Sequence, residues 1–189
     1  VLNLYFPGDT SVQTPAGQHL TLHLNTDYPY GNGVISIKLS LPAPEAFALT
    51  LRIPNWSRST SLTVNGEAME ITDTGYHSFA RTWQDGDTLV LTPDMRTFAV
   101  RPPQGACDED SFLAYRRGPI LLGADARLGI DPAADYAIAQ DSDSVVAAVP
   151  ASCTEVPDSH LCLAMPMANG STIRLIDYAS TGKTWDESS

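Results

Sequence analysis

The sequence predicts an all-β fold, an antiparallel β-sandwich in two consecutive sandwich domains with few or no helices. Apolar and polar residues alternate in short runs along most of the 189 residues. Turn-forming residues separate these runs at the spacing that is typical of sandwiches. The 3.6-residue period of an amphipathic helix is almost absent. Sheets with one buried and one solvent-facing side account for all three observations.

The alternating runs begin near the N-terminus and continue to the last residues. Leu20, Leu22 and Leu24 alternate with polar residues and form the first clear run. Successive strand side chains point to opposite faces, so these leucines are expected on one buried face. The further expected strands are Ile35 to Leu41, Phe47 to Ile53, Leu62 to Val64, His77 to Trp83, Leu89 to Leu91, Phe98 to Val100, Ile120 to Leu122, Val145 to Val149, Leu161 to Met165 and Thr172 to Tyr178.

Turn chemistry supports the same fold. Asn65-Gly66 predicts a two-residue hairpin turn, because a type I′ turn needs positive φ at both central residues. Asp85-Gly86-Asp87 and Asn169-Gly170 predict turns in the same way. Pro132 to Gln140 could form a short helix or a loop, and we expect a long connection over residues 125–144.

A domain boundary is expected where the composition changes. Pro102 to Gly105, followed by Asp108 to Asp110, has the composition of a linker. We therefore expect a first sandwich domain at residues 1–103 and a second, C-terminally truncated one at 104–189. A single larger sandwich is the alternative. The chain opens on an alternating run without Met, so we expect it to be a piece of a longer protein.

The charge excludes some partners. Eleven basic residues face twenty-two acidic ones, a formal net charge of −11. Binding to nucleic acid depends on Lys and Arg that neutralise phosphates, and an acidic surface repels phosphates and anionic membranes. No run approaches the ~20 apolar residues of a membrane span. We expect neither nucleic acid nor a membrane as a partner, whereas a neutral glycan fits the charge.

Catalytic and metal-binding motifs are missing. Cys107, Cys153 and Cys162 form neither a C-x-x-C pair nor a disulfide framework, so we expect no metal or other cofactor in this chain. Cys162 is expected to be a small core residue, and a Cys153–Cys162 bridge stays open. Most acidic residues lie in turns, where they cap backbone groups. No nucleophile or phosphate-binding motif occurs, so we predict no catalytic residue.

Loop aromatics are the remaining candidate site residues. Tyr28 and Tyr30 lie in a Tyr-Pro-Tyr-Gly loop, and Trp185 lies in a C-terminal loop. These three are expected to contact either a glycan or a neighbouring domain. Trp56 and Trp83 stand beside strand runs, so we expect them to pack between sheets or under a loop.

Four segments carry a resemblance to a known family. They are Thr26 to Gly31, Leu51 to Trp56 with Val64 to Glu67, Gly75 to Asp87, and Tyr115 to Ile120. In this order they resemble the region after the catalytic domain in glycoside hydrolase family 127, the β-L-arabinofuranosidase family, formerly a domain of unknown function. The resemblance runs from about Leu2 to Gly123 and more loosely to Trp185. Tyr30 stands where many relatives carry tryptophan.

The resemblance implies a catalytic (α/α)6 barrel that precedes β-sandwich domains. The family's chemistry is attributed to a cysteine nucleophile, a glutamate acid/base and a cysteine-rich zinc site, all in the barrel. Cys107, Cys153 and Cys162 match no part of that motif. The resemblance therefore implies zinc in the missing barrel and carries no catalytic role over to this chain.

Three hypotheses follow. In the first, the chain is the non-catalytic C-terminal β-sandwich region of a bacterial-type glycoside hydrolase that acts on plant-type glycans, and it braces or shapes the missing barrel. In the second, it is a carbohydrate-binding module that uses its loop aromatics. In the third, it is an independent hydrolase on a β-scaffold. Many relatives are exported, but the sequence leaves a periplasmic, secreted or cytoplasmic location open.

Overall fold

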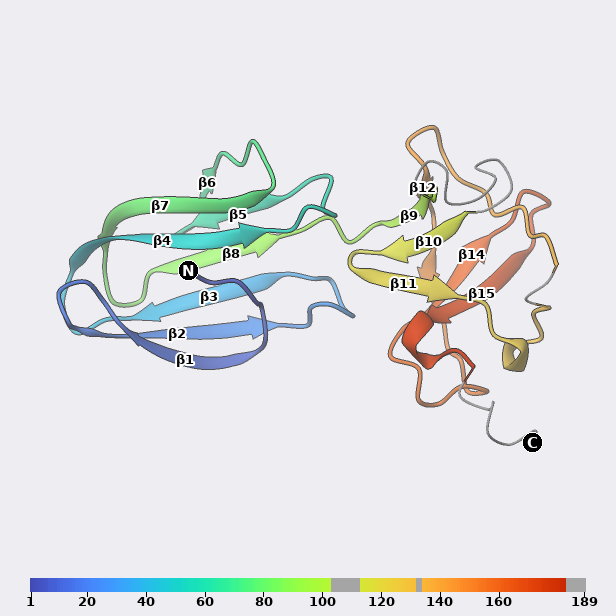
Figure 1. Ribbon diagram of the computed structural model, residues 1–189, viewed down its shortest axis with the longest axis horizontal. Coiled ribbons are helices and arrows are strands. Elements are labelled where there is room, and N and C mark those ends of the chain that lie inside the picture. Colours follow the sequence, from blue (N-terminus) through green and yellow to red (C-terminus); the bar gives the residue numbers. More distant parts are fainter. Residues whose placement is uncertain (103–112, 132–133, 183–189) are drawn as a thin grey trace. The chain divides into compact units, whose positions relative to one another are not determined.

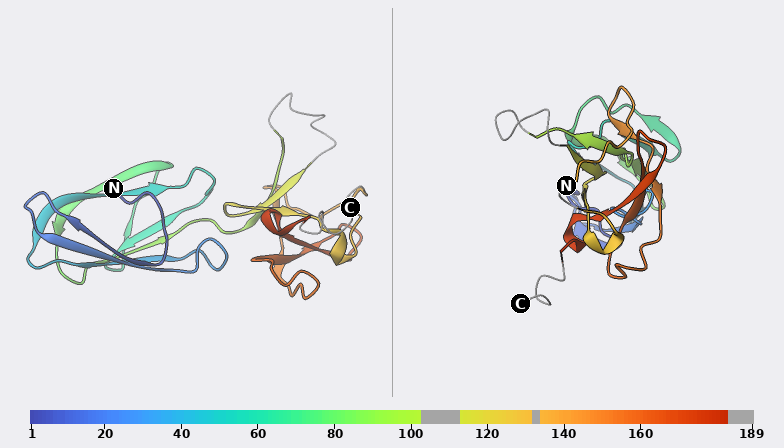
Figure 2. Two further views of the ribbon diagram at one scale, coloured as in Figure 1. Left: turned by 60° about the horizontal axis from the view of Figure 1, so that its bottom comes forward. Right: turned by 90° about the vertical axis from the view of Figure 1, so that its right-hand side faces the viewer.

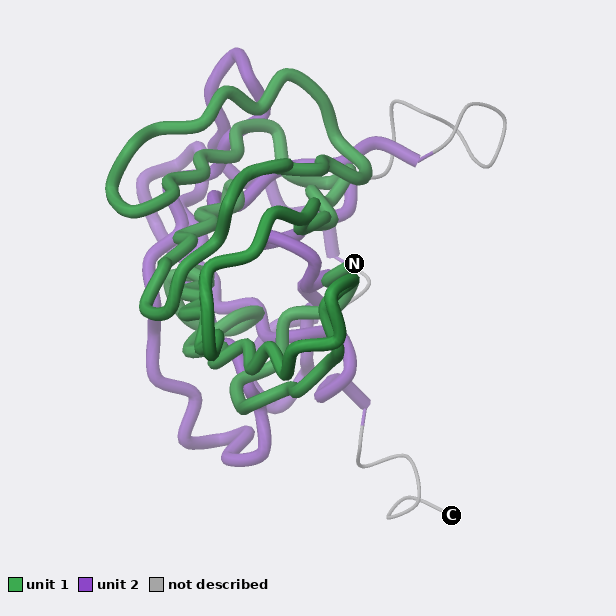
Figure 3. The backbone as a smooth tube through the Cα atoms, turned by 90° about the vertical axis from the view of Figure 1, so that its left-hand side faces the viewer, with its two compact units in different colours: residues 1–95 green, residues 96–189 purple. Residues whose placement is uncertain are grey.

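The computed structural model describes residues 1–102, 113–131 and 134–182 and is all-β, which confirms the predicted fold class (Figure 1). Fifteen strands and two short 3-10 helices form the regular structure of these residues. The chain divides into two compact units, Val1–Met95 and Arg96–Ser189 (Figure 3).

Unit 1 holds two antiparallel sheets. One has six strands in the order β1-β2-β3-β8-β5-β6, and the other pairs β4 with β7. The strands are β1 (Gly8–Gln13), β2 (His19–Thr26), β3 (Ile35–Ser40), β4 (Glu45–Ile53), β5 (Ser61–Val64), β6 (Glu67–Met69), β7 (Gly75–Trp83) and β8 (Thr88–Thr92).

The core of unit 1 lies between these sheets, as the alternating runs predict. Ile35 and Ile37 of β3 are fully buried, whereas Ser36 between them is partly exposed. Leu51 of β4 and Trp83 of β7 enter the same core from the two-stranded sheet. Burying aliphatic side chains in this way stabilises the fold by roughly 1.5–3 kcal/mol for each.

One end of unit 1, called here the turn end, consists of the tight turns at residues 14–18, 41–44, 65–66 and 84–87. Hydrogen bonds from side chains fasten it. The Glu45 carboxylate accepts from the Ala16 N–H at 2.8 Å and from the Gln18 side-chain amide at 2.9 Å. Asp87 accepts from the Asn65 side chain at 2.8 Å. These bonds join neighbouring turns, so this end is closed by polar contacts.

Unit 2 contains one seven-stranded sheet in the order β12-β9-β10-β11-β15-β14-β13. Val146 of β12 and Met165 of β14 lie in one core although their strands are far apart in that order. The sheet therefore bends around its own core instead of facing a second sheet. Its elements are β9 (Thr97–Val100), β10 (Ala114–Arg117), β11 (Ile120–Gly123), η1 (Ala126–Leu128), β12 (Val145–Val146), β13 (Val149–Pro150), β14 (Cys162–Pro166), β15 (Thr172–Asp177) and η2 (Tyr178–Ser180).

The division between the units lies earlier in the chain than the expected boundary. That boundary, near Pro103, falls outside the described residues. The units divide between Met95 and Arg96 because β9 pairs with β10 and β12 and so belongs to unit 2. Residues 132–133 lie outside the described part as well, and residues 134–140 form a loop with one isolated bridge, Ile138 to Met167.

The cysteines fall into two groups. Cys153 and Cys162 form a disulfide, the alternative that the spacing left open. Both are buried beside Val156 and Ile176. Cys107 lies outside the described residues. In the part of the chain that the structure describes, no helix has the length and apolar character needed to cross a membrane.

Candidate contact site at the loop end of unit 1

The end of unit 1 opposite the turn end carries its long loops and is called here the loop end. It comprises residues 4–7, 27–34, 54–60 and 70–74. Strand register brings them together, since Thr26 pairs with Ile35 and Ile53 pairs with Gly75. The loops after β2 and after β4 leave the sheets at the same end of the unit in Figure 1 and in the left view of Figure 2.

Asp27 fixes the 27–33 loop. Its carboxylate accepts hydrogen bonds from the N–H groups of Asn32 at 2.8 Å and Gly33 at 2.9 Å. Its carbonyl accepts from Gly31 at 2.9 Å. A Cβ at Gly31 would overlap the Asp27 side chain, so glycine is required there. A short carboxylate that bonds its own loop in this way is typical of ordered turns.

Tyr28 faces inward from this loop. Its ring stacks on Trp56 with centroids 6.3 Å apart and planes 11° apart, which is ordinary offset stacking. Burial raises the pKa of the Tyr28 phenol above its usual 10.0, against a smaller opposing effect of Arg52. The phenol is therefore neutral at physiological pH, and the Tyr28–Trp56 pair forms a fixed base for the loop.

The other two predicted contact residues differ in what the structure shows. Tyr30 is 41% exposed and lies on the fixed 27–33 loop. Trp185 lies outside the described residues. Trp83, which we expected to pack, is fully buried and donates its indole N–H to the Phe47 carbonyl at 3.1 Å. The contact roles of Tyr28, Tyr30 and Trp185 remain predictions.

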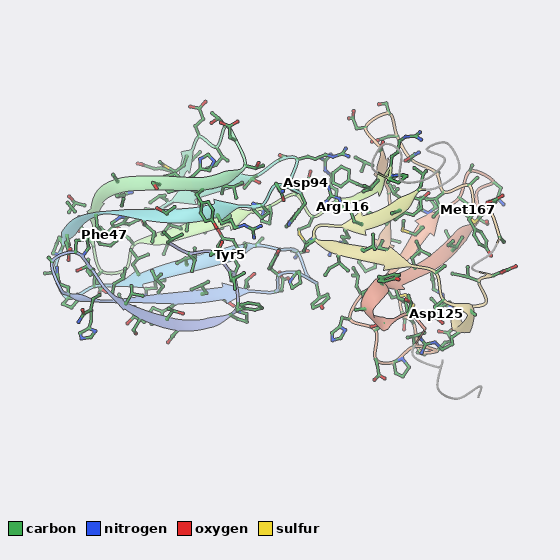
Figure 4. The ribbon with its side chains drawn as sticks, viewed as in Figure 1. Tyr5, Phe47, Asp94, Arg116, Asp125 and Met167 are labelled. Carbon is green, nitrogen blue, oxygen red and sulfur yellow. A yellow bond between two sulfur atoms is a disulfide. The ribbon has the colours of Figure 1, made fainter. Side chains whose placement is uncertain are left out.

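The N-terminal segment adds exposed apolar residues that the sequence analysis missed. Leu2 pairs with β4 through backbone hydrogen bonds to Thr50 and Arg52 at 2.8 and 3.1 Å. Tyr5 is buried between the sheets, and its hydroxyl donates to the Arg52 carbonyl at 2.6 Å (Figure 4). Leu4 and Phe6, on either side of Tyr5, are 60% and 68% exposed. Alternation in this run indicated a strand and did not show that one face would be uncovered.

A shallow polar hollow of about 310 Å³ lies between the 54–60 and 70–74 loops. Ile53 and Ile71 contribute its apolar lining, with hydroxyl groups and Asp73 around them. The Ser57 hydroxyl accepts a hydrogen bond from the Asp94 N–H at 2.8 Å (Figure 4). That bond fixes the loop and occupies a group that could otherwise bind a ligand.

Several carboxyl groups have pKa values below their usual range. Hydrogen bonds from the Arg127 side chain lower the pKa of Asp125, and those from Arg174 lower the pKa of Glu155 to about 2. Burial raises the pKa of Asp177, but hydrogen bonds from three donors outweigh it and leave the pKa below 3.8. These groups stay ionised near neutral pH, which suits structural hydrogen bonding.

The described residues, 1–102, 113–131 and 134–182, contain no group of three or more His, Cys, Asp or Glu side chains that could hold a metal ion. They therefore do not fit the zinc site that the family resemblance implies.

The chain belongs to the family described as "Beta-L-arabinofuranosidase, GH127 middle domain", whose model matches residues 1–95. This confirms the resemblance to glycoside hydrolase family 127. A comparison with proteins of curated function found no match.

Three solved structures resemble the chain. Ara127N-Se, a GH127 β-L-arabinofuranosidase from Geobacillus stearothermophilus T6, matches with a TM-score of 0.74 and 22% identity, over 94% of this chain and 30% of that one. A chain described as a glycoside hydrolase matches with a TM-score of 0.74 and 23% identity, over 95% and 33%. The GH127 β-arabinofuranosidase BT3674 matches with a TM-score of 0.68 and 20% identity, over 94% and 32%.

These structures establish a shared fold. At 20–23% identity, the likeness extends to the fold alone. The chain spans about a third of the length of each solved structure.

Proposed function

We propose that the chain is a non-catalytic β-sandwich region of a larger glycoside hydrolase that acts on plant-type glycans. In that enzyme it braces the catalytic (α/α)6 barrel and shapes one wall of its pocket. The chain's membership of the GH127 middle-domain family, together with its match to only 30–33% of larger glycoside hydrolases, supports this role.

The state of several described carboxyl groups supports the non-catalytic part of the proposal. A glycosidase needs a general acid whose pKa is raised, opposite a second carboxylate. Asp125, Glu155 and Asp177 have lowered pKa values instead, because hydrogen-bond donors hold them ionised. Asp87 is buried between donors from Asn65 and Gln84. Zinc, where the parent enzyme uses it, would be held by the barrel.

Assays of the purified 189-residue chain and of its parent polypeptide test the proposal. With aryl β-L-arabinofuranosides as probes, the isolated chain should give no turnover above buffer. Deleting the segment from the parent polypeptide should lower its melting temperature and its yield of soluble protein. Turnover by the isolated chain that a single Asp or Glu substitution abolishes would overturn the proposal and favour an independent hydrolase.

A second candidate function, carbohydrate binding, is favoured by one observation. Tyr30 presents an exposed aromatic ring on a fixed loop, and such rings suit sugar stacking. Titrating the chain with arabinan while following tryptophan fluorescence tests this function, because Trp56 lies close by in the Tyr28 stack. Saturable binding that Tyr30→Ala removes would support it. An unchanged signal at millimolar sugar would exclude it.

A further inference from the structure

Exposed apolar side chains gather at the loop end of unit 1. Those at this end, called here the loop-end apolar group, are Leu4 (60%), Phe6 (68%), Tyr30 (41%), Val34 (40%) and Tyr76 (60%). The register places Tyr76 and Val34 at this end, since Tyr76 pairs with Arg52 near the end of β4 and Val34 directly precedes Ile35, which pairs with Thr26. Single exposed apolar residues are ordinary, whereas several in one region mark an interaction site.

The backbone that carries these side chains is held in place. Tyr5 anchors the segment between Leu4 and Phe6 in the core of unit 1. The Tyr76 hydroxyl donates to the Asn3 side chain at 2.7 Å and joins β7 to the same segment. A surface that is ordered before binding loses less conformational entropy when it binds. The loop-end apolar group is therefore preorganised for binding.

The turn end differs in composition. Its side-chain hydrogen bonds close the turns. Apart from Tyr76 at the far end of β7, the large exposed apolar residues on the strands that adjoin these turns are Val12 of β1 at 45% and Met69 of β6 at 37%. Unit 1 thus has hydrogen-bonded turns at one end and, at the other, five exposed apolar side chains and the loops that carry the polar hollow. This difference indicates that unit 1 docks through its loop end.

We propose that the loop-end apolar group docks against an apolar face of the parent polypeptide's catalytic domain. This inference rests on the proposed function. In the three solved relatives, the matched region is only 30–33% of the chain. Most of each polypeptide therefore lies outside this region, and that remainder is the partner we propose for the exposed apolar surface. Leu4 and Val34 are aliphatic and offer a sugar neither an aromatic face nor a hydrogen bond. The mixture therefore favours a protein surface over a glycan.

A binding experiment tests the surface. The 189-residue chain is titrated calorimetrically into the remainder of its parent polypeptide, expressed separately. The Leu4→Ser/Phe6→Ser variant should bind about tenfold or more weakly, because large apolar side chains at the centre of an interface carry much of the binding energy. Val12→Ser, an exposed apolar residue near the turn end, is the matched control and should bind within about twofold of wild type.

The outcomes separate the two proposals. Wild-type binding that the Leu4→Ser/Phe6→Ser variant leaves unchanged, with both proteins folded by circular dichroism, would overturn the docking surface and leave the bracing role standing. No binding by the wild-type chain to a remainder that circular dichroism shows to be folded would overturn both. Sedimentation of the isolated chain adds a third outcome. A wild-type dimer that becomes a monomer in the Leu4→Ser/Phe6→Ser variant would show that a second copy of the chain covers this surface. That result would overturn the proposed partner.

Discussion

At the scale of single residues, the buried carboxylates of unit 2 are structural. Asp125 is 5% exposed and accepts from the Arg127 side chain at 2.7 and 2.8 Å (Figure 4). It also accepts from the Gly182 N–H at 3.1 Å. One side chain therefore joins the start of η1 to the segment after η2, which lies far away in the sequence. Nothing in the sequence distinguished this aspartate from the many that lie in turns.

Asp125→Asn should destabilise unit 2 in a pH-dependent way. Hydrogen bonds from Arg127 hold the pKa of Asp125 below its usual 3.8. The stabilisation is therefore complete above pH about 4 and is lost as the pH falls further. We expect a loss of about 2 kcal/mol at pH 7, which shrinks below pH about 4. Urea unfolding at several pH values measures it.

The exposed ion pair provides the control. Glu155 is 41% exposed and pairs with Arg174 at 2.7 Å. Exposed pairs are screened by solvent and contribute little, so Glu155→Gln should change the free energy of unfolding far less than Asp125→Asn. Equal losses from the two substitutions would contradict the assignment of a special role to Asp125.

At the scale of elements, the turns were easier to predict than the pairings. Asn65 and Gly66 both have positive φ, 52° and 84°, which confirms the predicted hairpin turn between β5 and β6. The pairing of β4 with β7 crosses two intervening strands and could not be derived from local patterns. The sequence likewise did not decide how residues 151–161 are held. In the structure the Cys153–Cys162 disulfide closes this loop.

Breaking the Cys153–Cys162 disulfide should loosen the 151–161 loop. The bond closes a short loop whose buried side chains include Val156. Closing a loop of this length stabilises a protein by about 3 kcal/mol in the chain-entropy description. We expect Cys153→Ser/Cys162→Ser to lower the stability of unit 2 by that order, as measured by thermal unfolding.

Alkylation provides an independent check of the same bond. The sequence has three cysteines, so denatured protein should react at one thiol without reductant and at three with it, counted by mass spectrometry. Disulfides persist in oxidising compartments, so a protein purified from the periplasm or medium is the appropriate sample. Three reactive thiols before reduction would contradict the bond.

At the scale of the whole molecule, the chain has two separate sets of core residues. The main cluster of unit 1 consists of residues between Tyr5 and Leu91, and the clusters of unit 2 consist of residues between Leu122 and Ile176. Each unit therefore has apolar burial of its own. Domains with their own cores generally unfold as separate units.

Calorimetric unfolding should show two transitions that single substitutions move separately. Trp83 is fully buried in unit 1, and Trp83→Ala should cost that unit about 3–5 kcal/mol. The transition of unit 2 should stay where it is, whereas reductant should lower only that one. A single transition that both treatments shift would show that the units unfold together.

The sequence by itself determined the fold class, the faces of most strands and the family. Period-two alternation and turn residues are local features of the sequence. The burial of Leu20, Ile37 and Leu51 could therefore be predicted without knowing which strands pair. The sequence determined the candidate site only in part. Sequence placed Tyr28 and Tyr30 in one loop but did not show that Tyr28 packs against the core of unit 1 while Tyr30 is exposed.

Only the tertiary structure decided which apolar residues stay uncovered. Tyr28 is covered because Trp56 comes from a distant loop, and Tyr5 is covered because β4 lies over it. Leu4 and Phe6, in the same run as Tyr5, meet no such neighbour. Burial depends on contacts between segments far apart in the sequence, and local alternation carries no information about those contacts.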